Sequence, residues 1–208
     1  NQMGCWWPGL TVSPEDDSQM MIRSLIFALF SLSTAAIAAE PFEPEVINGC
    51  GIWPHTRCPG VDLRHANLAG KNLAGADFTG AKMARVDLRG ANLAGAIFDG
   101  ADLTSARLNK ATAPTASFRG TKMIGADLEF ARLFRADFTN ADLTGANLEA
   151  AKANFSWFAG ARLVNTNLQE TKFFTVNFRG ADLSGAFRRF TVFQDADFEG
   201  CTGCPTDW

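Results

Sequence analysis

The chain has 208 residues, of which 47% are hydrophobic and 20% are charged, and its formal net charge is −3. This length is sufficient for one domain with its own core. The sequence has no block of like charges that would suggest a disordered tail.

Residues 20–38 have the layout of a secretory signal peptide. Arg23 is followed by about fifteen apolar or small residues, and the stretch Ala36, Ile37, Ala38 predicts cleavage after Ala38. The apolar run is shorter than the roughly 20 residues that a membrane span needs. An uncleaved anchor and an ordinary helix remain the alternatives. Cleavage would remove three acidic residues and one basic residue and leave a net charge of −1.

Residues 1–19 precede this signal, and we interpret them as a non-native or mis-assigned extension, with translation starting at Met20 or Met21. Export also bears on the cysteines, because secreted proteins form disulfides. The cysteines that remain after cleavage are Cys50, Cys58, Cys201 and Cys204. The alternative for the first pair is a zinc site, with ligands Cys50, His55, Cys58 and His65. We predict the disulfide, and neither a metal nor a cofactor.

Residues 61–200 repeat with a period of five. From Leu63 to Phe198 there are 28 centres, of which 14 are Leu, nine are Phe and two are Met. The residue two positions before each centre is Ala, Val, Thr or Ser except at Lys71, and Gly occurs 13 times two positions after it. Residues two apart in extended chain face the same side, and Gly allows the positive φ of a tight turn. Each unit therefore predicts a short extended side followed by a corner.

A second period of 20 residues runs through the same segment. Four corners would close one square coil every 20 residues, so residues 20 apart should stack. The predicted inner stack is the core ladder Phe78, Phe98, Phe118, Phe138, Phe158, Phe178 and Phe198. An outer column alternates in charge sign and predicts ion pairs between coils, at Asp62, Lys82, Asp102, Lys122, Asp142, Arg162 and Asp182.

Units such as ANLAG, ADFTG and ADLTG closely resemble those of the pentapeptide-repeat proteins, and the resemblance covers residues 61–200. It implies an all-β fold, a right-handed quadrilateral parallel β-helix (a solenoid) of about seven coils of 20 residues. At strand spacing, such a stack is about 34 Å long. Arg188 occupies a centre, and a buried unpaired charge is costly. We therefore predict a local distortion that turns Arg188 outward.

The two ends of such a stack need caps, because open β ends pair with other chains. The predicted caps are residues 39–60, with Trp53 over the first coil, and residues 201–208, ending in Trp208. The cysteine pairs lie at opposite ends, about 34 Å apart, whereas bridged Cα atoms lie roughly 4.4–6.8 Å apart. The predicted disulfides are therefore Cys50–Cys58 and Cys201–Cys204.

Large aromatic and basic residues gather at outward positions of the later repeats. Exposed apolar patches mark contact surfaces, and Trp, Phe and Arg are frequent anchors. The alternative is that these side chains lie flat over neighbouring β surface. The predicted binding residues are Phe134, Phe155, Trp157, Phe174, Arg132, Lys152 and Lys172, with Arg135 nearby. Phe187 and Phe190 predict a homodimer contact near the C-terminal end.

The sequence contains no recognisable catalytic constellation, and we interpret its recurrent outward Asp and Asn as solvated ladder residues rather than catalytic carboxylates. We expect no enzyme, but an exported protein-binding or structural scaffold in the periplasm, outside the cell or in a thylakoid lumen. The expected partner is an unknown protein, with no nucleic acid and no membrane span in the mature form. The resemblance implies one alternative, because some pentapeptide-repeat proteins imitate DNA and bind DNA gyrase. A thiol redox role of Cys201 and Cys204 is a further alternative.

Overall fold

The computed structural model of the chain describes residues 45–206, so the predicted segments 1–19 and 20–38 and the terminal Trp208 lie outside the described residues. The described part begins with β1 (Val46–Ile47) and β2 (Cys50–Gly51), which form an antiparallel hairpin. Within residues 45–206, no helix is long and apolar enough to cross a membrane.

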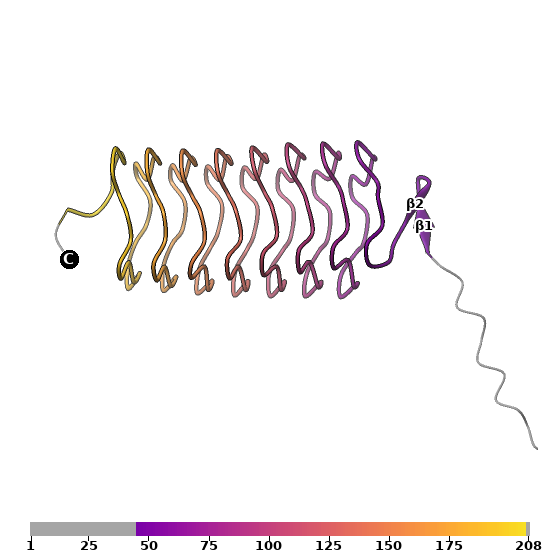
Figure 1. Cartoon of the computed structure of the whole chain (residues 1–208), viewed down its shortest axis with the longest axis horizontal. Coiled ribbons are helices and arrows are strands. Elements are labelled where there is room, and N and C mark those ends of the chain that lie inside the picture. The colour runs from indigo at the N-terminus through magenta and orange to yellow at the C-terminus, as the bar shows by residue number, and fades with distance from the viewer. Residues whose placement is uncertain (1–44, 207–208) are drawn as a thin grey trace, which may run out of the picture. The chain divides into compact units, whose positions relative to one another are not determined.

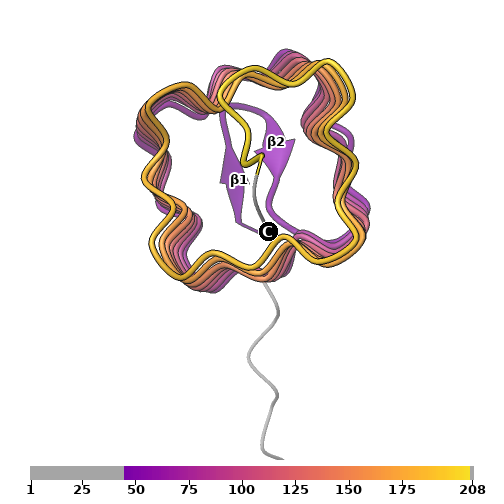
Figure 2. The same ribbon diagram turned by 90° about the vertical axis from the view of Figure 1, so that its left-hand side faces the viewer.

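After the hairpin, the backbone winds into stacked coils (Figure 1), and their outline along the stacking axis is four-sided (Figure 2). Parallel bridges join each outward residue to the residue 20 positions later, from Arg57 to Thr202. Two hydrogen bonds accompany each bridge. The amide of Phe78 donates to the carbonyl of Ile97 at 2.7 Å, and the amide of Ile97 donates to the carbonyl of Ala76 at 2.8 Å. Each side is thus a parallel β-ladder that runs through all the coils.

Each side ends in a tight turn that contains a residue with positive φ. After Phe78, Gly80 has a φ of 64°, and the amide of Ala81 donates to the carbonyl of Phe78 at 3.0 Å. A side chain makes this conformation unfavourable, which explains why Gly is common at this place in the repeat. Asn140 interrupts one column of glycines and adopts the same φ, 59°.

The centre residues fill the interior of the coils. The rings of the predicted core ladder stack, with neighbouring centroids 4.7–5.4 Å apart, and those from Phe78 to Phe178 are fully buried. Phe198, in the last coil, is only partly buried. A second stack forms where Phe173 and Phe193 lie 5.4 Å apart, and it meets the ladder edge-on. Stacked and edge-on rings both have favourable quadrupole geometry.

Buried threonines replace alanine at some inner small positions without leaving an unpaired hydroxyl. Thr121 donates from its hydroxyl to the carbonyl of Phe98 at 2.9 Å, and Thr166 makes the equivalent bond to Leu143 at 2.9 Å. Both acceptors lie 23 residues earlier, on the adjacent coil. A buried polar group with a partner avoids most of its desolvation cost, so Thr fits where the repeat otherwise has Ala.

The predicted ion-pair ladder is mostly absent, although its residues do lie in one column of bridges. Among the described residues of that column, Arg162 and Asp142 form an ion pair, at 4.0 Å. The carboxylates instead turn toward their own corner. Asp142 accepts the amide of Thr144 at 3.0 Å, and Asp62 binds the guanidinium of Arg64 at 2.6 Å. A local bond does not prevent a bond to the next coil, as Asp142 shows, but most carboxylates of this column make only the local bond.

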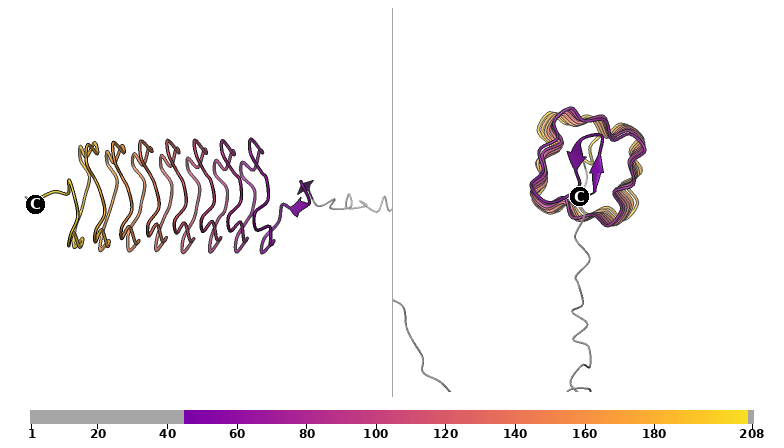
Figure 3. Two further views of the ribbon diagram at one scale, coloured as in Figure 1. Left: turned by 90° about the horizontal axis from the view of Figure 1, so that it is seen from above. Right: turned by 90° about the vertical axis from the view of Figure 1, so that its right-hand side faces the viewer.

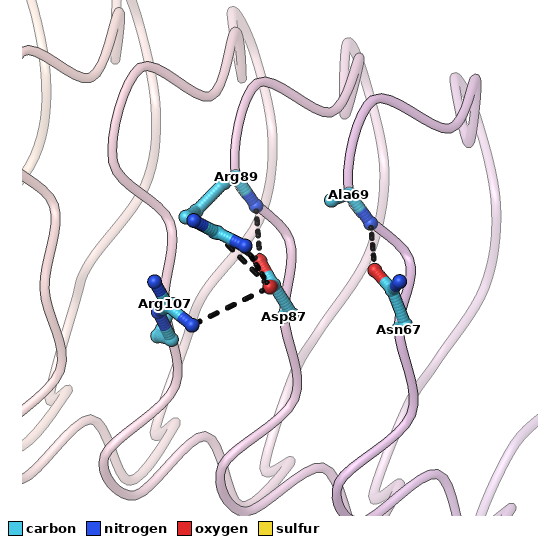
Figure 4. Close-up of polar contacts among 5 residues, drawn as sticks. All are labelled: Asn67, Ala69, Asp87, Arg89 and Arg107. Atoms are coloured by element: carbon cyan, nitrogen blue, oxygen red, sulfur yellow. Dashed lines mark hydrogen bonds and ion pairs between the residues drawn. The ribbon is translucent and has the colours of Figure 1, made fainter.

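A neighbouring column shows the same use of outward Asp and Asn (Figure 4). Asn67 accepts the amide of Ala69 at 3.2 Å, and Asp87 accepts the amide of Arg89 at 3.2 Å. Asp87 also pairs with the guanidinium of Arg89 at 2.6 Å and with that of Arg107, on the next coil, at 3.6 Å. These residues therefore hold the turn that follows each side.

The N-terminal boundary differs from the prediction. The ladder begins at Arg57 rather than at 61, because Cys58 is buried in a centre position and Thr56 is buried in the small position before it. β1 and β2 lie across the end of the coils (Figure 3), and the side chain of Asn48 donates to the carbonyl of Asp62 at 2.6 Å. The ring of Trp53 lies against Gly51, and the residue is 37% exposed. Cys50 is bonded to Cys58, with Cα atoms 5.6 Å apart.

At the other end, Cys201 is bonded to Cys204, with Cα atoms 5.9 Å apart. Arg188 is exposed as expected, but the predicted distortion is wrong. The bridge of Phe187 and the turn after Arg188 keep the geometry of the repeat. Arg188 belongs to the last coil, and its guanidinium donates to the carbonyl of Gly203 at 3.0 Å. The end of the stack, not a change in the backbone, leaves this charge accessible to water.

Candidate binding surface

Three cations stack on one side of the coils, at Arg132, Lys152 and Lys172. Bridges join Arg132 to Lys152 and Lys152 to Lys172, and all three residues are exposed. We call these three residues the basic column. Bridged strands lie about 4.8 Å apart, so their positive charges are close neighbours. Among the described residues, no ion pair includes any of the three.

The corner that follows the basic column carries aromatic residues on successive coils: Phe134, Phe155 and Phe174, which we call the aromatic corner. Phe134 and Phe155 meet edge to face, with centroids 5.3 Å apart, and the guanidinium of Arg135 lies 5.2 Å from the Phe134 centroid. The amide of Phe155 donates to the carbonyl of Phe174 at 2.8 Å. Phe134 is 41% and Phe155 is 43% exposed, whereas Phe174 is half-buried. Phe134 and Phe155 therefore remain largely open to water, and Phe174 partly lies over its neighbours.

Trp157 lies on the side after this corner and is 45% exposed. Bridges place it between Asp137 and Asn177. One hollow beside it is lined by Arg135, Phe155, Ser156, Trp157, Thr175 and Asn177. A second hollow also reaches Trp157 and includes Ile97, Arg119 and Asp137. The structure therefore joins Trp157 to the aromatic corner in one continuous surface.

Phe130 is a member of this surface that the sequence interpretation missed. It is 50% exposed and has a φ of 56° in the corner that precedes the basic column. It lines a hollow with two members of that column; the lining residues are Lys110, Thr112, Phe130, Arg132, Ala150 and Lys152. A signal was present in the sequence, because Phe130 occupies a corner place that is Gly in 13 of the 28 repeats and Phe in three. The basic column, the aromatic corner, Trp157 and Phe130 together form what we call the basic–aromatic surface.

The other candidate residues lie at the two ends of the coils. Cys50 and Cys58, of the alternative zinc site, are bonded to each other, and so are Cys201 and Cys204. Within residues 45–206, no group of three or more His, Cys, Asp or Glu side chains is arranged to hold a metal ion. At the C-terminal end, Phe187 and Phe190 are both exposed, and the guanidinium of Arg189 lies 4.9 Å from the Phe190 centroid.

Comparisons with known proteins give one family. The pentapeptide repeats family, in eight copies, matches residues 57–93, 81–113, 116–149, 150–187 and 172–202. A search of curated proteins found no match.

Solved structures with the same fold include QnrB1, described as a plasmid-mediated fluoroquinolone resistance protein. A trypsin-treated QnrB1 variant superposes with a TM-score of 0.69 at 19% identity, covering 74% of this chain and 80% of its own. Full-length QnrB1 gives 0.65 at 19% identity, covering 72% and 84%. The pentapeptide repeat protein Rfr23 from the cyanobacterium Cyanothece 51142 gives 0.34 at 29% identity, covering 66% and 90%. At 19% identity, the likeness to QnrB1 is one of fold: the right-handed β-helix of pentapeptide-repeat proteins.

Proposed function

Since the chain belongs to the pentapeptide-repeat family, we propose that it is an exported, non-enzymatic β-helix of about seven coils of 20 residues that binds a protein partner or serves as a structural scaffold. The observation that carries this proposal is the basic–aromatic surface. Phe134, Phe155 and Trp157 are all exposed at neighbouring positions, and clustered exposed aromatic residues are typical of contact surfaces.

The polar residues of the coils support a non-enzymatic role. The outward Asp and Asn side chains accept amides of the following turn, as Asp87 and Asn67 do. They recur because every corner needs an acceptor, and this structural role accounts for their abundance.

Export is proposed from the signal-peptide layout of residues 20–38 and from the two disulfides at the ends of the coils. The compartment would be the periplasm, the extracellular space or a thylakoid lumen. Fractionation of the native host and N-terminal sequencing test this proposal. We expect the mature chain to start at Ala39 in an exported fraction, and a chain retained in the cytoplasm with residues 20–38 intact would contradict export.

Partner capture from native-host extract tests the binding surface. The triple variant F134S/W157S/F174S should fold normally, because Phe134 and Trp157 are exposed and Phe174 is half-buried outside the core. It should lose the captured partner. The matched control V46S/I124S changes exposed apolar residues away from this surface and should retain the partner. Equal capture by both variants would reject the surface.

Gyrase antagonism is the alternative that the family resemblance implies, and the charge distribution opposes it. A DNA mimic needs a continuous acidic surface, whereas the basic column sets three cations on one side. The purified protein should leave supercoiling by DNA gyrase unchanged at micromolar concentration. Inhibition of supercoiling by the protein, or protection of DNA gyrase from a fluoroquinolone, would favour gyrase antagonism over the scaffold function.

Self-association at the C-terminal end is a second part of the proposal. Phe187 and Phe190 are 54% and 66% exposed, and two copies in contact would bury both. Light scattering should report a dimer for the wild type and a monomer for F187S/F190S. A wild-type monomer at high concentration would exclude this contact.

A further inference from the structure

The basic column has three positive charges on successive coils, whereas the charge sign alternates from coil to coil in another column of the same molecule. Asp62, Lys82 and Asp102 follow one another along the first side, whereas the basic column has Arg132, Lys152 and Lys172 on successive coils. Like charges directly opposite each other on adjacent strands destabilise a sheet. Since no ion pair of the described residues compensates them, folding alone does not explain the column.

The corners beside the column carry large side chains although their backbone has a positive φ. Phe130, Arg135 and Phe155 have φ values of 56°, 55° and 60°, a conformation that bulky side chains disfavour. At the matching places in other coils, Gly90 and Gly95 adopt the same φ without a side chain, and Lys110 and Thr115 adopt it with one. The conformation is therefore general to the repeat, and what distinguishes this surface is the large exposed side chains beside the stacked cations.

The distribution of charge limits what kind of partner fits. The corner before the column carries Glu129, Glu149 and Glu170 beside Lys110, so carboxylates border the line of positive charge that runs along the stacking axis. A membrane or a nucleic-acid duplex presents a broad anionic surface and would meet these carboxylates. A single extended chain is narrow enough to follow the line, and its side chains on one face lie about 7 Å apart, within reach of flexible Lys and Arg side chains.

The aromatic corner favours a peptide over single-stranded nucleic acid. Bases bind proteins by stacking on open ring faces. Arg135 lies over the ring of Phe134, and Phe155 meets that ring edge to face. The exposed edges of these rings are suited to apolar side chains.

We propose that the basic–aromatic surface binds an acidic, extended segment of a partner protein, with carboxylates on Arg132, Lys152 and Lys172 and an apolar side chain against Phe134 and Phe155. This inference rests on the proposed protein-binding function and gives the chemistry of the partner. Charge complementarity directs such a segment to the surface and makes its binding dependent on salt.

Fluorescence anisotropy with defined probes tests this inference. The probe is a fluorescein-labelled twelve-residue peptide of Glu, Leu and Ser in equal parts; its comparison probes are the same peptide with Gln for Glu, and a twelve-residue oligothymidylate. The protein should prefer the acidic peptide to both, and the affinity should fall as salt rises. The variant R132Q/K152Q/K172Q should bind it at least tenfold more weakly, as expected for loss of three exposed ion contacts.

The matched control removes the same number of cations from the opposite side of the square: K82Q/K122Q/R162Q. It should keep the affinity of the wild type. Thermal unfolding adds a readout that needs no ligand. The R132Q/K152Q/K172Q variant should have a higher Tm than the wild type because like charges are removed, whereas the control should not, because its cations lie next to carboxylates.

Four outcomes would overturn the inference: no binding of the acidic peptide, equal binding of the Gln peptide, preference for the oligothymidylate, or unchanged affinity in R132Q/K152Q/K172Q. If capture from host extract still depends on Phe134, Trp157 and Phe174, the proposed function survives such a result and only the acidic chemistry of the partner is wrong. If capture from host extract does not depend on these three residues either, the proposed binding function is wrong as well.

Discussion

At the scale of single residues, the outward Asp and Asn are acceptors for the corner that follows them. Asp87 makes this bond to the amide of Arg89 and adds two ion pairs, one within its coil and one to Arg107 (Figure 4). Asn67 makes the same turn bond without a charge. The turn bond is therefore the common function of the column, and the ion pairs are additional.

This ranking predicts different effects of two substitutions at Asp87. D87A removes the turn acceptor and should lower the free energy of unfolding by about 1 kcal/mol. D87N keeps an acceptor of similar shape and should cost about 0.5 kcal/mol or less, since exposed ion pairs contribute little. Urea unfolding of both variants measures the difference. An equal loss in the two variants would mean that the ion pairs, rather than the turn bond, matter at this position.

The same bonds set the response to acid. Hydrogen bonds from Arg64 lower the pKa of Asp62 to about 2, and hydrogen bonds from Arg89 and from Thr104 lower the pKa values of Asp87 and Asp102. A folded-state pKa below the unfolded value means that the stabilisation is complete above the ordinary Asp pKa of 3.8 and is lost as the pH falls toward 2. The free energy of unfolding should therefore be constant from pH 7 to about 5 and decrease below about 4. A stability that rose on acidification would contradict this assignment.

At the scale of the element, every corner of the repeat has a residue with positive φ, and Gly occupies 13 of these 28 places. Phe130 and Gly90 occupy the same place in different coils, with φ values of 56° and 63°. A Cβ at Gly90 would meet no atom within 4 Å, so the conformation rather than space opposes a side chain there. Phe130 adopts a conformation that Gly would adopt at lower cost, as Lys110, Ala150 and Glu170 do in the same column, and its exposed ring is the feature that suits contact with a partner.

A reciprocal pair of substitutions tests this explanation. F130G should raise the free energy of unfolding by about 0.5–1 kcal/mol, since relief of the positive φ exceeds the added entropy of the unfolded chain. G90F should lower it by a similar amount. F130G should also weaken partner binding. If F130G destabilised the protein instead, the ring would be a packing residue and not a contact residue.

At the scale of the whole molecule, the coils are a linear array in which each layer contacts its neighbours. Phe118 lies between Phe98 and Phe138, with centroids 5.1 and 4.8 Å away, and is fully buried. Phe198 is in the last coil and is partly buried. In such arrays, the stability is close to a sum of layer and interface contributions.

Position along the stack should therefore decide the cost of removing a ring. F118A should lower the free energy of unfolding by about 3–5 kcal/mol, the usual range for a buried Phe. F198A, at the end of the stack, should cost less than half as much because fewer layers contact it. Denaturant unfolding monitored by circular dichroism provides both values. Equal costs at the two positions would contradict a layered architecture.

The repeating features of the sequence predicted the family and its fold. An apolar residue every five positions, with a small residue two positions before it, predicts a coil made of short sides and corners even where single units depart from the pattern. The choice that each carboxylate makes among nearby hydrogen-bond donors was less predictable. Asp62 and Asp102 carried the charge signs for a ladder, but their carboxylates bind nearer donors, the guanidinium of Arg64 and the amide of Thr104. The predicted start of the coils was a few residues late because Cys58 was not recognised as a centre; a cysteine is not the usual residue there.

For the candidate surface, the sequence predicted which residues lie at neighbouring outward positions, but it did not determine how exposed each side chain is. Side-chain spacing placed Phe134 and Phe155 on one corner, but their edge-to-face contact and open position depend on rotamers that the repeat does not determine. Phe130 was missed because it lies in the corner before the basic column, whereas the other aromatic residues lie in the corner after it. Its departure from Gly was the available signal.

Photo-crosslinking in the native host tests the central claim, that this face of the coils contacts a protein partner, most directly. Benzoyl-phenylalanine replaces Phe155 in one variant and Ile124 in the other, since both residues are similarly exposed. The account predicts one discrete crosslinked protein from position 155 and none from position 124. Crosslinks that are equal at the two positions, or absent at position 155, would contradict it.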